Sequence, residues 1–209
     1  MTVFRYGPVE VAHLAKKDRK LGLAIKRIGM IERKVIPDLF AALIHNIVGQ
    51  QIAAKAAATV WGRLQLCCGA ITPQIIAAAS AEEIQKCGLS MRKASYIKGV
   101  GEAVMNKELN IAEFPALPDE EIIRRLSGLN GVGVWTAEML MIFSLERPDI
   151  LSWGDLAIRR GMMALYGLKD LDRATFEKYR NRYSPYGSVA SLYLWRLSAE
   201  APLKKKSRG

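Results

Sequence analysis

The stretch LSGLNGVGVWTAE, residues 126–138, decides the fold of this chain. Its two glycines, Gly131 and Gly133, separate the end of one short helix from the start of another. Glycine permits the positive φ angles of a sharp turn and leaves room for a ligand to approach the backbone. Consecutive N–H groups at a helix N-terminus attract phosphate. The stretch therefore predicts a helical hairpin that can hold a phosphate, although glycine also serves simple packing at many helix corners.

Helical patterns continue on both sides of the hairpin, without the alternation that marks β-strands. The sequence therefore predicts an all-α fold. We expect helices over residues 9–29 with turns near Gly22 and Gly29, from Pro37 onward, over 53–66, from Thr72-Pro73, after a capping box at Ser80, after Ser90, over 118–127, over 134–145, after Asp155 and over 188–199.

Composition narrows the function classes. The chain has 31 basic and 20 acidic residues among 209, a net charge of +11, which favours a polyanionic partner without requiring one. No apolar run reaches the ~18 residues of a membrane-spanning helix, and the N-terminus lacks a signal peptide's apolar centre. We therefore expect no membrane association and a cytoplasmic, nucleoid-associated protein. The three cysteines and two histidines lack metal-ligand spacing, so no side-chain metal site is expected.

Three blocks, in the right order, give a specific resemblance. LNGVGVWTA (129–137) resembles the Leu-Pro-Gly-Val-Gly hairpin of the helix-hairpin-helix DNA glycosylase superfamily. IVGQQI (47–52) resembles the superfamily's early Gln-containing helix–loop, and SPYGSVASLYLW (184–195) the C-terminal segment of its alkylpurine branch, the DNA-3-methyladenine glycosylase II group. The resemblance covers about residues 37–197.

The resemblance implies one glycosylase unit over residues 1–209, in two closely packed helical subdomains with an active-site cleft between them. Residues 36–145 carry the hairpin, residues 1–35 plus 146–200 form the second subdomain, and 201–209 are a basic tail. The length predicts the compact form, without the N-terminal β-rich domain of some relatives. Asn130 replaces the family's usual proline, and Ser152-Trp153-Gly154 stands where proline is common, which leaves the shape of the pocket open.

In this superfamily an aspartate follows the hairpin, and Asp155 lies 20 residues beyond Trp135. Its carboxylate would stabilise the positive charge that develops on the deoxyribose as the N-glycosidic bond breaks, and would orient the attacking water. An aspartate at a helix N-cap is also explained by capping alone. Asp149 is the rival acid, six residues too early for the pattern.

Position 135 bears on the reaction type. Bifunctional members carry a lysine there, whose amine forms a Schiff base with the sugar. Trp135 instead predicts hydrolysis by water, without strand nicking, and its ring would attract a cationic alkylated purine. The resemblance extends the base pocket to Met139, Trp195 and Trp153, although packing alone also explains the last two.

The resemblance also implies contacts to DNA from which the target base has been flipped. Gln50 or Gln51 would fill the gap, and the sequence does not choose between them. The expected DNA-binding residues are Gly131, Gly133, Val134, Thr136, Gln50, Gln51 and Ser188. A K+ or Na+ ion would lie on main-chain carbonyls of Ser127, Leu129 and Val132 and bridge to a phosphate.

Other basic side chains would add sequence-independent attraction to the backbone, from exposed positions. These are Arg92, Lys93, Lys98 and the run Lys204-Lys205-Lys206.

The implied function is a monomeric, monofunctional glycosylase that removes alkylated purines from double-stranded DNA in base excision repair. No cofactor is expected apart from the hairpin cation. Two alternatives stay open: a glycosylase for uracil, hypoxanthine or mismatched thymine, and a non-catalytic DNA-binding module, for which a carboxylate at position 155 would be unnecessary.

Overall fold

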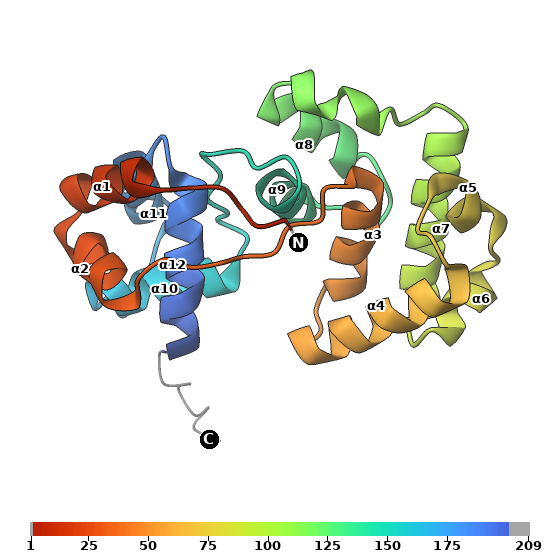
Figure 1. Cartoon of the computed structure of the whole chain (residues 1–209), viewed down its shortest axis with the longest axis horizontal. Helices are drawn as coiled ribbons and strands as arrows, with labels where there is room; N and C mark the ends of the chain where they lie inside the picture. The colour runs from red at the N-terminus through yellow and green to blue at the C-terminus, as the bar shows by residue number, and fades with distance from the viewer. Residues whose placement is uncertain (1, 201–209) are drawn as a thin grey trace. The chain divides into compact units, whose positions relative to one another are not determined.

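The computed structural model describes residues 2–200, and its regular structure is helical (Figure 1). These residues form twelve α-helices and one 3₁₀ helix, with a single isolated β-bridge between Val3 and Lys34. None of the helices described is both long and apolar enough to cross a membrane. The predicted basic tail, with Lys204-Lys205-Lys206, lies outside the described residues. The all-α class predicted from the sequence is confirmed.

Contacts between Cα atoms separate two helical units, and the unit that carries the hairpin spans residues 35–145 together with Thr2. Its central helix is α3, whose six buried residues face α4, α7, α9 and η1. Its elements are α3 (Leu39–Gly49), α4 (Ala54–Cys68), α5 (Pro73–Ala78), α6 (Ala81–Lys86), α7 (Met91–Met105), the 3₁₀ helix η1 (Ile111–Ala116), α8 (Asp119–Ser127) and α9 (Val134–Phe143).

Short polar side chains set the helix starts in this unit. The predicted capping box at the start of α6 is confirmed, because Ser80 and Glu83 each accept the other's backbone N–H. The helix expected from Pro37 begins instead at Leu39, because Asp38 caps it by accepting the Ala41 N–H at 2.7 Å.

The other unit comprises residues 3–34 and 146–200 of the described chain. Its helices are α1 (Pro8–Lys17), α2 (Arg19–Ile28), α10 (Leu156–Tyr166), α11 (Arg173–Tyr183) and α12 (Gly187–Glu200). Figure 1 shows α12, in blue, among the other four, and it contacts each of them. A Cβ atom built on Gly161 of α10 would lie 2.0 Å from the Leu194 carbonyl oxygen, so the two backbones meet there.

Two sequence predictions about the helices are wrong. The single helix expected over residues 9–29 is two helices, because Asp18 caps a new one by accepting the Leu21 N–H at 2.9 Å. Gly22, where a turn was expected, lies inside α2. Helices α11 and η1 were not predicted, and α9 ends two residues before its predicted end.

Candidate functional site

Asp155 is held at the N-terminus of α10. Its Oδ1 atom accepts the N–H groups of Ala157 at 2.8 Å and of Ile158 at 2.9 Å, and the residue is only 7% exposed. The two amide donors fix the orientation of the carboxylate, and the first turn of the helix favours a negative charge at this place. The capping role expected from the sequence is therefore confirmed, and it leaves a rigidly placed acid.

Asp149, the other acid considered for catalysis, uses its carboxylate in hydrogen bonds within its own helical unit. One carboxylate oxygen accepts the hydroxyl of Ser184 at 2.5 Å, and the other accepts the N–H of Gly187 at 2.9 Å, at the start of α12. Both oxygens are thus engaged in joining residue 149 to the segment that begins α12. This arrangement suits a structural acid better than a chemical one.

Trp153, two residues before Asp155, is enclosed by side chains of α10 and α11. The guanidinium carbons of Arg159 and Arg173 lie 5.0 and 5.3 Å from the centre of its ring, and Phe176 meets it edge-on at 5.1 Å. Two cations and one ring thereby fix this tryptophan in place. The contacts support the packing interpretation of Trp153, which steadies the loop that carries Asp155.

The other three expected pocket residues lie on two helices. Trp135 stands half-buried in the first turn of α9, and Met139 follows it one turn later, buried. Trp195 lies on α12, half-buried, directly after a continuous buried run that ends at Leu194.

The two glycines of the turn between α8 and α9 differ in backbone conformation and in the space around them. Gly131 has φ +81°, and a Cβ atom there would fall 2.0 Å from the ring of Tyr96 on α7. Gly133 has φ −95° and no atom within 4 Å of a built Cβ, so of the two glycines only Gly131 has a positive φ. The fold therefore requires glycine at position 131. At Gly133 the absence of a side chain leaves open space through which a ligand can reach the backbone.

Backbone donors gather beside that open space. No residue in the described chain accepts a hydrogen bond from the N–H groups of Gly131, Gly133 or Val134. Val134 is half exposed at the first position of α9, where the helix dipole is positive. The turn therefore has the donors and the charge that the sequence predicted for a phosphate site.

Gln50 braces this turn from the end of α3. Its side-chain nitrogen donates to the carbonyl oxygen of Gly131 and to the hydroxyl of Thr136, both at 2.9 Å. Thr136 is only 2% exposed, so its side chain serves this brace rather than the expected contact with DNA. The adjacent Gln51 is exposed and has φ +57°, a conformation uncommon outside glycine. The structure thus distinguishes Gln50, which is engaged within the protein, from Gln51, which is exposed, where the sequence could not choose between them.

Lys93 of α7 holds the same end of α3. Its Nζ atom donates to the carbonyl oxygens of Val48 at 2.9 Å and Gln50 at 2.5 Å, and burial lowers the pKa of this ammonium. Lys98 similarly donates to the carbonyls of Ala77 and Ala79 after α5, at 2.8 and 3.1 Å. The prediction that both lysines are exposed is therefore wrong: each is half-buried and donates to carbonyls at the negative end of a helix. Arg92 is exposed, as expected.

Ser188 is completely buried. Its hydroxyl donates to the Arg147 carbonyl at 2.5 Å and accepts the Ile150 N–H at 3.0 Å, while its own N–H donates to Pro148. Its hydroxyl and its N–H together fasten the loop 147–150 to α12. The expected contact between Ser188 and DNA is therefore replaced by an internal role.

Sequence reasoning missed two residues that shape the site. They are Tyr96, which packs on Gly131, and Lys93 in its role at the end of α3. Their partners lie more than thirty residues away along the chain, so no local pattern could have marked them.

Comparison with known proteins agrees with this architecture. Residues 44–185 match the family described as HhH-GPD superfamily base excision DNA repair protein. DNA-3-methyladenine glycosylase 1 of Schizosaccharomyces pombe is 31% identical over 94% of this chain and 90% of its own length.

Two solved structures are similar over nearly the whole chain. The DNA-3-methyladenine glycosidase of Bacillus halodurans has a TM-score of 0.80 and 34% identity, over 95% of this chain and 93% of its own. The S. pombe 3-methyladenine DNA glycosylase Mag1, in complex with abasic DNA, has a TM-score of 0.82 and 31% identity, over 90% and 95%. The chain therefore belongs to the HhH-GPD superfamily of base excision DNA repair proteins, in its DNA-3-methyladenine glycosylase branch.

Proposed function

We propose that this protein is a monofunctional DNA glycosylase that hydrolyses the N-glycosidic bond of alkylated purines, of the 3-methyladenine and 7-methylguanine type, in duplex DNA. The product is an abasic site for base excision repair. The observation that carries the proposal is the fixed, largely buried carboxylate of Asp155 at the start of α10, in a chain of this family.

Asp155 acts on the sugar. Departure of the base leaves positive charge on the deoxyribose, and a carboxylate held by two backbone amides stabilises that charge without having to reorient. The same group orients the water that completes the hydrolysis. A protonated or alkylated purine is a good leaving group, so the reaction needs little help from a second acid.

Trp135 supplies a stacking surface for a cationic base, and its indole cannot form the Schiff base through which bifunctional members nick the strand. Met139, buried one turn after Trp135 on the same helix, extends the apolar surface for the base in this proposal. The product is therefore an intact strand with a missing base.

The α8–α9 turn anchors the DNA backbone. The N–H groups of Gly131, Gly133 and Val134 bind a phosphate, and a K+ or Na+ ion on the carbonyls of Ser127, Leu129 and Val132 would add positive charge there. Gln51 is exposed next to Gln50, the residue that holds this turn. It fills the gap left by the flipped nucleotide, and its side-chain amide forms hydrogen bonds with the base that has lost its pairing partner. We assign this role to Gln51 rather than Gln50, because the Gln50 amide already donates to Gly131 and Thr136.

The test is base release from defined duplexes. We expect the protein to free methylated purines from DNA treated with a methylating agent, and the strand to break only after alkali is added. Uracil- and hypoxanthine-containing duplexes are the comparison substrates. Release of uracil or hypoxanthine in preference to methylpurines would overturn the substrate assignment, and binding without any release would leave only a DNA-binding module.

A further inference from the structure

The three cysteines gather at one place in the hairpin-bearing unit. Cys67 and Cys68 are the last two residues of α4, and Cys87 caps the end of α6. Burial first, and then the nearby Cys67, raise the pKa of the Cys68 and Cys87 thiols. All three are free thiols.

The backbone around Cys87 rests on the face of α4 that carries Cys67. A Cβ atom built on Gly88 would lie 3.2 Å from Nη1 of Arg63 and 3.5 Å from Cγ2 of Val60. Val60, Arg63 and Cys67 follow one another at spacings of three and four residues, which places them on one side of a helix. The packing of the end of α6 on this face of α4 therefore brings Cys87 near Cys67.

The exposure of the two thiols differs. Cys67 is exposed at the end of α4, whereas Cys87 is only 4% exposed, with its sulfur 3.7 Å from the Glu83 carbonyl oxygen. In residues 2–200 no group of three His, Cys, Asp or Glu side chains is arranged to hold a metal ion. A solvent-facing thiol against a sheltered one is instead the arrangement of a dithiol that oxidises in two steps.

We propose that Cys67 and Cys87 form a reversible redox site that closes a disulfide in response to hydroperoxides. In the first step the Cys67 sulfur attacks a peroxide oxygen; the O–O bond breaks, leaving a sulfenic acid on Cys67 and releasing water. In the second the Cys87 sulfur attacks the Cys67 sulfur and expels the hydroxyl, which leaves as water with the Cys87 proton. Two thiols are oxidised and one hydrogen peroxide is reduced to two waters.

The order of the steps follows from the surroundings. Cys67 is exposed to a peroxide in solution, whereas Cys87 is sheltered, and burial followed by the neighbouring Cys67 raises the pKa of the Cys87 thiol to about 11. Cys68 is a poor disulfide partner for Cys67, because the Cα atoms of consecutive residues lie about 3.8 Å apart, closer than the roughly 4.4–6.8 Å usual in disulfides. The disulfide would join the end of α4 to the end of α6, and a dithiol of this kind in a reducing compartment acts as a sensor rather than a permanent staple.

The experiment treats the full chain with hydrogen peroxide, traps remaining thiols with N-ethylmaleimide under denaturing conditions, and locates disulfides by peptide mass spectrometry. We expect wild type to lose two of its three thiols, to link residues 67 and 87, to gain several degrees in Tm and to recover fully with dithiothreitol. Cys68→Ser is the matched control and should behave as wild type.

Cys67→Ser, at an exposed position that should not disturb folding, should form no intramolecular disulfide. Cys87→Ala should leave Cys67 free to oxidise further, to the sulfinic acid. A link between residues 67 and 68, covalent dimers in place of an internal bond, or three intact thiols after treatment would each overturn the proposal. None of these outcomes depends on glycosylase activity.

Discussion

The side-chain amide of Gln50 reaches across 81 positions of sequence to hold the carbonyl oxygen of Gly131 at 2.9 Å. It thereby joins the end of α3, where Gln51 is exposed, to the turn that presents unpaired N–H groups. Lys93 fixes the other side of Gln50 through its carbonyl. The phosphate anchor and the proposed gap-filling loop are thus parts of one hydrogen-bonded assembly within a single helical unit.

Gln50 and Gln51 should respond differently to alanine. Gln50→Ala removes the two part-buried hydrogen bonds that the side chain donates to Gly131 and Thr136. We therefore expect a loss of about 1–3 kcal/mol in the free energy of unfolding and weaker binding to any duplex. Gln51→Ala should leave stability unchanged but slow base release under single-turnover conditions. Chemical denaturation and a release assay check both, and equal loss of stability in the two variants would contradict the assignment.

Gly131 and Gly133 offer a second matched pair. Gly131→Ala places a methyl group in the Tyr96 ring and forces a non-glycine residue to positive φ, which alone costs about 1–2 kcal/mol, so the melting temperature should fall markedly. Gly133→Ala meets no neighbour and should stay within about 0.5 kcal/mol of wild-type stability. Its DNA affinity should nevertheless fall at least about tenfold, as expected for the loss of a phosphate contact. Normal DNA binding by folded Gly133→Ala would show that the phosphate lies elsewhere.

Lys93 should matter for stability rather than for charge attraction. Lys93→Met removes a charged donor from two carbonyls at the end of α3, and we expect a loss of about 1.5–3 kcal/mol in the free energy of unfolding. Lys55→Met, at an exposed position on α4, removes the same charge and should cost almost nothing. Urea denaturation of the two variants compares them directly. Equal stabilities of the two variants would show that Lys93 does not stabilise the end of α3.

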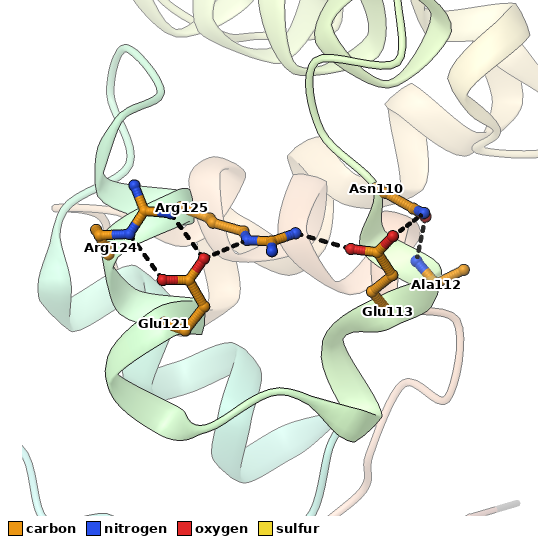
Figure 2. Close-up of polar contacts among 6 residues, drawn as sticks. All are labelled: Asn110, Ala112, Glu113, Glu121, Arg124 and Arg125. Atoms are coloured by element: carbon orange, nitrogen blue, oxygen red, sulfur yellow. Dashed lines mark hydrogen bonds and ion pairs between the residues drawn. The ribbon is translucent and has the colours of Figure 1, made fainter.

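The first helix of the hairpin should contribute a pH dependence to stability. Hydrogen bonds from Arg124, and then Arg125, lower the pKa of Glu121 to about 2, and Arg125 also pairs with Glu113 of η1 (Figure 2). Because the folded pKa is depressed, this stabilisation is fully present above the unfolded value near 4.5 and is lost as the pH falls from there toward 2.

Glu121→Gln should therefore lower the Tm at neutral pH, and the gap from wild type should narrow as the solution is acidified through that window. Glu82→Gln, an exposed acid of α6, is the control and should show no such convergence. A gap independent of pH would mean that Glu121 acts through its shape alone.

Local chemistry made part of this molecule predictable from sequence. The capping residues Ser80 and Asp155 predict where their helices begin to within a few positions. The glycines of the hairpin predict the turn between α8 and α9. The break at Asp18 escaped detection because the helical pattern continues across it and one side-chain oxygen decides the start of α2.

Contacts between distant segments were not predictable. Nothing near Thr136 or Ser188 indicates that their hydroxyls are used internally, since their partners come from other helices and loops. For the same reason Lys93 and Lys98 were predicted to be exposed, and no local pattern distinguished Gln50 from Gln51. The family resemblance located the candidate residues, and the packing assigned their separate tasks.

The most direct test of the account compares Asp155→Asn with wild type in single-turnover release of methylpurines from duplex DNA. Asparagine is as good a helix cap as aspartate, so the variant should keep the fold and its DNA affinity while losing only the charge. We predict a rate at least about a hundredfold lower, in line with removal of one preorganised electrostatic group. Asp149→Asn should lose stability instead and keep most of its rate, because Asp149 holds Ser184 and Gly187. Wild-type release by folded Asp155→Asn would contradict the central claim that this carboxylate performs the chemistry.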